Sequence, residues 1–307
     1  MSQLLRRGYL SGIPALLAGL ACLAALPASA HSIDTIKKIA DSGTINIGHR
    51  ESSLPFSYYD NSRKVVGYSH DLTMKVVEAI RSELKLGSLT IKLVPVTAQN
   101  RLALVQNGSV DLECASTTHN TERGRAVTFS VSFFRIGTRL MTSPTTGIHD
   151  FPDLAGRRLV VTSGTTSEKL IRLYNERHGR KISILVARDH GESFAMLESQ
   201  KADAFMMDDA LLYGERMKSD HPERWIITGT PLSSEVYGCM MRKGDLELKR
   251  MVDTVLVRLM RGGEAMRLHH KWFQGPIPPK GLNLNWPPSP ELVELFNAPN
   301  DRALDGR

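Results

Sequence analysis

The chain is 307 residues long and has 39 lysines and arginines against 32 acidic residues, which gives a formal net charge of +7. The basic residues are spread along the chain rather than clustered, and this distribution argues against nucleic acid as the main partner. No stretch after the first thirty residues approaches the ~20 apolar residues that a membrane-spanning helix needs, so the mature chain is expected to be soluble.

The first thirty residues have the pattern of a secretory signal peptide. Arg6 and Arg7 precede an apolar run at 10–26, and small residues at 28–30 provide a cleavage site. We therefore predict export, with cleavage near Ala30. The two arginines also weakly match a twin-arginine signal, although the ordinary secretory route is preferred. About 277 residues remain, which is enough for two modest domains or one large one.

The first half of the mature chain alternates between helical and extended patterns. Such alternation is typical of a parallel sheet whose two faces are covered by helices. The expected elements are a helix at 33–39 that stops at 41–43, a strand at 44–48, a helix from about Ser69, a strand at 89–96, a helix at 100–106 and a strand at 110–114.

A second series of strands and helices follows, flanked by two further extended segments at 135–141 and 236–241. The series is expected to comprise strands at 158–161, 182–186, 204–207 and 225–228, with helices at 168–178, around Phe194 and Leu197, and after Asp208 and Asp209. We interpret the two extended segments as an outgoing and a return crossing between two lobes.

The two crossings divide the mature chain. Lobe 1 is predicted to comprise 31–138 and 236–307, and lobe 2 to comprise 139–235. A cleft between such lobes closes by bending at a few residues, here near Gly137 and Thr138 on one crossing and at 237–238 on the other.

The C-terminal residues are expected to complete lobe 1. A helix at 246–260 and another that ends at 270–273 would pack on it. The tail after Pro276 contains six of the fifteen prolines, so we predict an extended arm over about 276–307.

Two cysteines remain in the mature chain, Cys114 and Cys239. In an oxidising compartment an even pair favours a disulfide, which would close a long loop worth ~4 kcal/mol in the chain-entropy model. Two buried free thiols are the alternative. We predict the bridge, because export leaves few exposed thiols unpaired.

The stretch at 111–125 is a candidate binding segment. It starts as a strand, continues into the hydroxyl residues Ser116, Thr117 and Thr118, and places Arg123 within one helical turn. Hydroxyls, free backbone amides and a guanidinium at the carboxyl end of a strand suit a carboxylate. The alternative is a strand followed by a capped helix, with Arg123 in solvent.

Several longer runs carry a resemblance to a known family, at 48–59, 99–101, 113–118, 122–123, 161–168, 189–191, 204–210, 237–239 and 297–301. On these runs the chain resembles the periplasmic solute-binding proteins of polar amino-acid ABC transporters, and within them the glutamate/aspartate-binding branch. The resemblance implies an α/β, two-lobed periplasmic-binding-protein (type II) fold with two hinge crossings and an open cleft. It also implies a monomer in the periplasm that binds L-glutamate or L-aspartate and delivers it to a membrane permease, without a cofactor.

An acidic amino acid needs a protein partner for each of its charges in a closed cleft. The resemblance implies Arg123 with the backbone of Thr165 and Thr166 for the α-carboxylate, and Asp208 with Ser116 and Thr118 for the ammonium. The segment at 164–167 is also an ordinary helix-capping sequence. Asp208 could equally be only a helix N-cap.

The second carboxylate distinguishes acidic from neutral ligands. Arg50, Arg101 and His190 are the candidates, each just after a predicted strand. A guanidinium pairs with a carboxylate through two parallel hydrogen bonds, whereas a histidine donates a neutral or a charged bond according to its pKa. An exposed loop histidine is the alternative for His190. Ala98 stands where relatives tend to have serine, which leaves the preference between glutamate and aspartate open.

Two other functions fit the same fold. A dehydratase-like enzyme would need a protonated carboxyl group in the cleft, for which Glu51 and Glu113 are the candidates. Pairing with Arg50 or a hydrogen bond to a hinge is the alternative for both glutamates. A sensing module would present the bound amino acid to a membrane receptor. No nucleophile and base pair or metal-ligand set stands out, so we predict a binding protein and not an enzyme.

Overall fold

The computed structural model describes residues 34–305 of the chain. The predicted signal peptide and its cleavage near Ala30 therefore lie outside the described residues. Within the described range, no helix is both long enough and apolar enough to cross a membrane.

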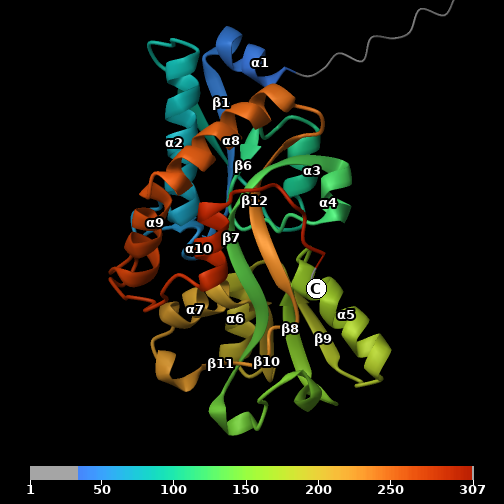
Figure 1. The fold of residues 1–307 in the computed structure, drawn as a ribbon. Coiled ribbons are helices and arrows are strands. Elements are labelled where there is room, and N and C mark those ends of the chain that lie inside the picture. Colours follow the sequence, from blue (N-terminus) through green and yellow to red (C-terminus); the bar gives the residue numbers. More distant parts are fainter. Residues whose placement is uncertain (1–33, 306–307) are drawn as a thin grey trace, which may run out of the picture. The chain divides into compact units, whose positions relative to one another are not determined.

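Two antiparallel strands form the centre of the main sheet (Figure 1). They are β7 (Val127–Thr142) and β12 (Ser234–Arg242), and β12 pairs with β7 over residues 127–137. The two predicted crossings are thus extended and bonded to each other, and β7 begins earlier than the predicted residue 135. Their register is irregular between Tyr237 and Gly238, at one of the two predicted bends.

The first half-sheet lies on the β12 side, in the order β5-β1-β6-β12. β1 pairs in parallel with β5 and β6, as the alternating sequence pattern predicted, and β12 is antiparallel to β6. Its elements are α1 (Thr35–Ser42), β1 (Thr44–His49), α2 (Tyr68–Glu83), β5 (Thr90–Pro95), α3 (Arg101–Gln106), β6 (Leu112–Glu113) and α4 (Thr121–Ala126). A separate antiparallel sheet between β1 and α2 comprises β2 (Ser52–Ser53), β3 (Ser57–Tyr59) and β4 (Val65–Val66).

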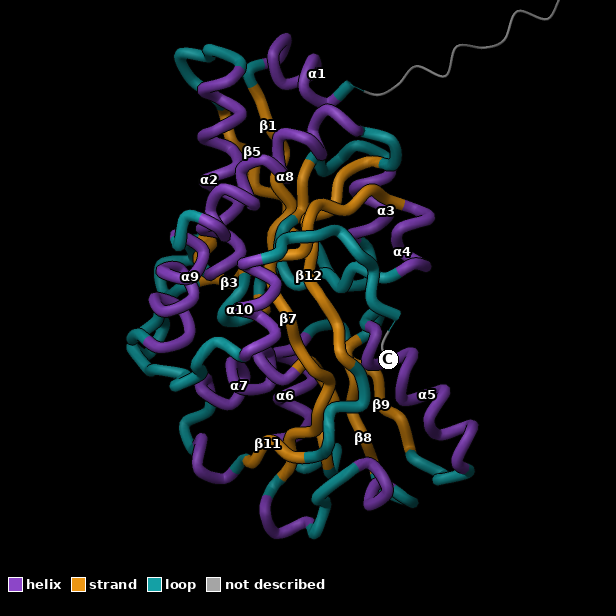
Figure 2. The backbone as a smooth tube through the Cα atoms, viewed as in Figure 1, coloured by secondary structure: helices purple, strands orange, loops and turns teal. Residues whose placement is uncertain are grey.

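The second half-sheet lies on the β7 side, in the order β7-β10-β8-β9, with β11 also paired to β7. β8 is parallel to β9 and β10, whereas β10 and β11 are antiparallel to β7. Its elements are β8 (Arg158–Thr162), α5 (Thr166–His178), β9 (Ser183–Ala187), α6 (His190–Glu198), β10 (Ala204–Asp208), α7 (Asp209–Lys218) and β11 (Ile226–Thr228). Figure 2 shows helices on either side of the strands.

Local capping fixes where α5 and α6 begin. The Thr165 hydroxyl accepts a hydrogen bond from Glu168 N, and the Asp189 carboxylate accepts one from Glu192 N. α5 ends at Gly179, whose φ of 59° lies in the left-handed region that glycine adopts readily. The loops before the two helices are therefore held close to the ends of β8 and β9.

The C-terminal residues correct one prediction. α8 (Leu246–Arg261) and α9 (Glu264–His269) form as expected, but the predicted arm is not extended throughout, because it contains α10 (Pro290–Asn297). Ser289 caps α10, and a proline is compatible with the first position of a helix. The helix buries Leu292, Leu295 and Phe296 and packs on β7 and α8 (Figure 1).

The predicted disulfide between Cys114 and Cys239 is confirmed, with an S–S distance of 2.20 Å. Cys114 directly follows β6, and Cys239 lies in β12. The bond therefore attaches the start of the candidate segment to a crossing strand.

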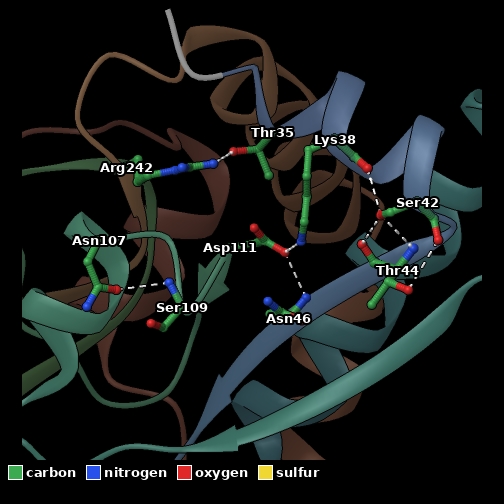
Figure 3. Close-up of polar contacts among 9 residues, drawn as sticks. All are labelled: Thr35, Lys38, Ser42, Thr44, Asn46, Asn107, Ser109, Asp111 and Arg242. Carbon is green, nitrogen blue, oxygen red and sulfur yellow. Dashed lines mark hydrogen bonds and ion pairs between the residues drawn. The ribbon is translucent and has the colours of Figure 1, made fainter.

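Asp111, the first residue of that segment, is also fixed in place (Figure 3). Its carboxylate is buried, accepts a 2.8 Å hydrogen bond from Asn46 N and forms an ion pair with Lys38. The contact with Asn46 ties the residue before β6 to β1. Residues 113–118 thus leave the sheet from a fixed position.

Candidate functional site

The nine predicted ligand-binding residues lie at strand ends and helix starts of both half-sheets. Thr166 is half-buried, and the other eight are buried: Arg50, Arg101, Ser116, Thr118, Arg123, Thr165, His190 and Asp208. The solvent-exposed alternatives for Arg123 and His190 are therefore wrong. Whether these residues contact a ligand stays a prediction.

Arg123 joins the candidate segment to the loop before α5. Its Nη1 donates to Thr118 O at 3.1 Å and its Nη2 donates to Gly164 O at 3.2 Å. Burial, and then the neighbouring Arg101, lower the pKa of Arg123 to about 10. The guanidinium therefore stays charged at neutral pH.

Gly164 allows the two half-sheets to meet at this loop. A Cβ atom at Gly164 would lie 2.6 Å from Gln99 Cα, and the φ of Gly164 is +75°. Both the close approach and the left-handed backbone require glycine. The loop before α5 therefore packs directly against the residues before α3.

Glu235 is a part of the site that the sequence interpretation missed. It is buried in β12, and its Oε2 accepts hydrogen bonds from Thr118 Oγ1 at 2.6 Å and Thr166 Oγ1 at 2.9 Å. Its Oε1 accepts from Ser233 Oγ at 2.9 Å. One carboxylate thus holds two predicted contact residues from different half-sheets. An acidic residue inside an otherwise apolar extended segment was the available sequence signal.

Asp208 ends β10 and stands at the N-cap position of α7, but its side chain makes no capping bond. Its Oδ2 accepts a hydrogen bond from the Tyr237 hydroxyl, and its Oδ1 has no partner within the described residues. Burial, and then the charge of Glu235, raise the pKa of Asp208 well above its ordinary value. The alternative that the Asp208 side chain only caps α7 is therefore wrong. Its actual partner, Tyr237, was missed by the sequence interpretation.

Arg50 and His190 meet between the half-sheets. Arg50 Nη2 lies 3.4 Å from His190 Nε2, and His190 Nδ1 lies 2.9 Å from Thr162 Oγ1. Burial and then the nearby Arg50 lower the pKa of His190 well below 6.5. Burial and then Arg101 lower the pKa of Arg50 to about 10. The pair is therefore a charged guanidinium beside a neutral imidazole.

The hydroxyls of Thr162 and Ser193 determine which ring nitrogen of His190 carries the proton. Ser193 Oγ donates to Asp189 O at 3.0 Å, so the 2.8 Å bond between Ser193 and Thr162 uses the Thr162 hydroxyl proton. Thr162 Oγ1 can then only accept from His190 Nδ1. His190 Nε2 is left as an acceptor for Arg50, which means that the ring and the guanidinium are oriented by one continuous chain of hydrogen bonds.

Arg101 is held by the candidate segment. Its Nη1 donates to Ser116 O at 3.0 Å and to Thr117 Oγ1 at 2.6 Å, and Thr117 Oγ1 donates to Glu113 Oε2 at 2.7 Å. Arg101 Nε and Ser116 Oγ are buried and have no hydrogen-bond partner among residues 34–305. These two atoms can therefore donate to a bound molecule.

The three buried guanidiniums bond to neutral acceptors. Arg50 contacts an imidazole, Arg101 a carbonyl and a hydroxyl, and Arg123 two carbonyls. None of the three guanidiniums is thus paired with a carboxylate through a direct hydrogen bond, and each can bind an anionic ligand. No group of three or more histidine, cysteine, aspartate or glutamate side chains in the described part of the chain could hold a metal ion.

A cavity of about 570 Å³ adjoins the site. Its lining includes Thr118, Thr166 and Glu235. It also includes Glu122 and Lys169, which form an ion pair between α4 and α5. A ligand of amino-acid size fits in such a volume.

The chain is similar to known proteins along most of its length. Residues 45–275 match the family model of the bacterial extracellular solute-binding proteins, family 3. A "Glutamate/aspartate import solute-binding protein" of Salmonella typhimurium is 53% identical over 88% of this chain and 90% of its own length. An "L-glutamate/L-aspartate-binding protein" of Pseudomonas aeruginosa is 52% identical, with the same coverage.

Solved structures agree with the fold. An ancestral arginine-binding protein bound to glutamine has a TM-score of 0.67 and 26% identity, covering 75% of this chain and 98% of its own. The ancestral amino acid-binding protein AncCDT-1, described as a precursor of cyclohexadienyl dehydratase, also has a TM-score of 0.67, with 25% identity over 78% of this chain and 99% of its own.

Proposed function

Because the chain belongs to the bacterial extracellular solute-binding proteins, family 3, we propose that its buried arginine cluster binds L-glutamate and L-aspartate for delivery to the permease of an ABC importer. The fold is the two-lobed type II fold of periplasmic binding proteins. The protein acts in the periplasm as a monomeric transport component and not as an enzyme. The two relatives that share about half of its residues are a glutamate/aspartate import solute-binding protein and an L-glutamate/L-aspartate-binding protein.

One observation carries the choice of ligand. Three buried guanidiniums, Arg50, Arg101 and Arg123, bond only to neutral acceptors, and Asp208 is buried near them with one oxygen unpartnered among the described residues. An unpaired buried ion costs several kcal/mol, so a ligand is favoured when each of its charges finds an opposite one. An acidic amino acid has two carboxylates and one ammonium, which match this set.

The α-carboxylate is assigned to Arg123 and to the backbone N–H groups of Thr165 and Thr166 at the start of α5. The ammonium is assigned to Asp208, with Ser116 and Thr118 as further oxygen partners. The unpartnered Asp208 Oδ1 and Ser116 Oγ support this assignment, because a protonated amine donates three hydrogen bonds.

The side-chain carboxylate is assigned to Arg50 and Arg101, with His190 beside them. The unpartnered Arg101 Nε supports the role of Arg101. In the arrangement described above, His190 Nε2 accepts from Arg50, so it would have to gain a proton before it could donate to a carboxylate. Ala98 provides no hydroxyl at this end of the site.

The lobes assigned to this function are 31–138 with 236–307, and 139–235. They would separate by bending near Gly137 and Thr138 and near 237–238 to release the ligand. The contact of Arg123 with Gly164 O supports a closed arrangement, because it joins the two lobes over the site.

Calorimetry of the purified protein with a panel of amino acids tests the proposal. L-Glutamate and L-aspartate should bind with micromolar or tighter affinity, about −8 kcal/mol or better. Glutamine and arginine should bind much more weakly, because each lacks the second carboxylate. If glutamine or arginine bound as tightly as glutamate, the assignment of Arg50 and Arg101 would fail.

A further inference from the structure

We propose that Glu113 is a positioning residue for the ligand's side-chain carboxylate, because it holds Arg101 in its binding orientation through the hydroxyl of Thr117. The inference rests on the proposed function, in which Arg101 meets that carboxylate. From the sequence, Glu113 is a candidate for the acid of an enzyme, for pairing with Arg50 or for a hydrogen bond to a hinge. The structure gives it a different use.

The contacts form a chain with a fixed direction. Thr117 has one hydroxyl proton, which it donates to Glu113 Oε2 at 2.7 Å. Its oxygen is then free to accept from Arg101 Nη1 at 2.6 Å. The guanidinium can only donate and the carboxylate can only accept, so the Thr117 hydroxyl accepts from Arg101 and donates to Glu113.

The sheet fixes the acidic end of this chain. Glu113 is fully buried at the end of β6, opposite Gly48 in β1 and Met240 in β12. Its Oε1 accepts a 3.2 Å hydrogen bond from Ala115 N. With both oxygens used as acceptors, the side chain has one orientation relative to the strands.

Gly48 provides the space that Glu113 occupies. A Cβ atom at Gly48 would lie 3.0 Å from Glu113 Cγ and 3.0 Å from Val110 Cγ1, which is tighter than ordinary packing. An alanine at this position would therefore force the Glu113 or the Val110 side chain to shift. Gly48 is the strand partner of Glu113, so its replacement bears directly on the place where Glu113 is held.

The electrostatics agree with this geometry. Burial lowers the pKa of Arg101, and among the charged groups that oppose this effect Glu113 is the strongest. Glu113 also opposes the lowering of the pKa of Arg50 and of Arg123. The two other buried acids of this site serve different partners, since Glu235 bonds to hydroxyls and Asp208 to a tyrosine.

Glu113 could affect glutamate affinity by holding Arg101 in place or through its own negative charge, and these two effects predict opposite changes when Glu113 is removed. A negative charge near the arginines repels an anionic ligand, so removing that charge alone would tighten glutamate binding. Loss of the orientation of Arg101 would weaken glutamate binding, and would do so more than it weakens glutamine binding. Thr117 separates the two effects, because replacing it changes no charge.

The experiment compares Thr117→Val with Thr117→Ser by calorimetry with L-glutamate and L-glutamine on the purified full-length exported protein. Thr117→Val removes the hydroxyl at nearly constant volume and should lower the glutamate-to-glutamine affinity ratio by about tenfold or more. Thr117→Ser keeps the hydroxyl and should stay near the wild-type ratio. Thr142→Val is the matched control, since it removes a buried hydroxyl that bonds Asp203 O at the far end of β7, and it should stay within about twofold.

Gly48→Ala provides a second route if Thr117→Val does not fold, as judged by circular dichroism. It should lower the glutamate-to-glutamine affinity ratio, and it replaces none of the hydrogen-bonded residues Arg101, Thr117 and Glu113. A folded Thr117→Val or Gly48→Ala protein with the wild-type ratio overturns the role of Glu113. Failure of the wild-type protein to bind glutamate or aspartate overturns the proposed function itself, and the inference with it.

Discussion

Arg50 Nη2 lies 3.4 Å from Nε2 of His190, and both side chains are buried. The contact joins the residue that follows β1 to the first residue of α6, which belong to different half-sheets. Burial, and then the nearby Arg50, keep the pKa of His190 well below its ordinary value. A neutral histidine in the folded protein has consequences for stability that can be measured.

Acidification should destabilise the protein through His190. In the unfolded chain the imidazole titrates near 6.5, whereas in the folded protein it stays neutral to lower pH. Below 6.5 the unfolded state therefore binds a proton that the folded state does not. The free energy of unfolding then falls as the pH falls, by up to ~1.4 kcal/mol per pH unit for this group.

Denaturant titrations of the wild type and of His190→Gln at pH 6.5 and 5.5 isolate this effect. Burial raises the pKa of Asp208, so this residue makes the folded protein more stable as the pH falls, opposite to His190. The contribution of Asp208 is the same in the wild type and in the variant, and it cancels in the comparison. The wild type should lose more stability over this interval than the variant, by ~1 kcal/mol, because the unfolded imidazole is already half-protonated at pH 6.5. Equal losses would mean that His190 takes up its proton over the same pH range in the folded and the unfolded states, which would contradict this expectation.

Arg123→Ala should weaken the binding of every amino-acid ligand, because the α-carboxylate is common to all of them. We expect a loss of at least ~2 kcal/mol for both L-glutamate and L-aspartate, since the carboxylate would be buried without its charged partner. Arg125→Ala is the matched control, because Arg125 is exposed in the same helix, α4. If calorimetry gave the same small change for both variants, the α-carboxylate would have to bind elsewhere.

Arg50→Ala should act on the side-chain carboxylate alone. L-Glutamate affinity should fall by at least ~2 kcal/mol, while the affinity for L-glutamine should change little. The exposed Arg63, which lies over the Tyr59 ring, provides the control variant Arg63→Ala. A competition assay against both amino acids measures the ratio, and an equal loss for the two ligands would contradict the assignment of Arg50.

Loss of the disulfide should destabilise the protein strongly. Cys114 and Cys239 are separated by 125 positions, and the chain-entropy model assigns about 4–5 kcal/mol to a loop of this length. Guanidinium chloride unfolding of the double variant Cys114→Ser and Cys239→Ser, compared with the oxidised wild type, measures the difference. A difference below about 1 kcal/mol would show that the unfolded chain gains little freedom when the bond is absent.

Local chemistry made much of the fold predictable from the sequence. The bounds of α5 follow from the Thr165 cap and from Gly179, both of which act within a few residues of the helix end. The first half of β7 was missed because it is defined by pairing with β12, about a hundred residues later. α10 was missed because the proline count of the tail outweighed the amphipathic spacing of Leu292, Leu295 and Phe296.

The candidate site was predictable as a set of residues, but its connections were not. The resemblance named Thr118 and Thr166 as contacts from matching runs of sequence. Their shared partner Glu235 is 117 positions from Thr118 and 69 from Thr166, so only the folded chain brings the three together. The same holds for Tyr237 and Asp208, whose bond depends on how β12 and β10 lie against β7.

A crystal structure of the protein with bound L-glutamate examines the whole charge-matching scheme at once. The scheme predicts the α-carboxylate on Arg123 and the N–H groups of Thr165 and Thr166, the ammonium on Asp208, and the side-chain carboxylate between Arg50 and Arg101. Glutamate bound in the reverse orientation, or bound away from the three arginines, would contradict it.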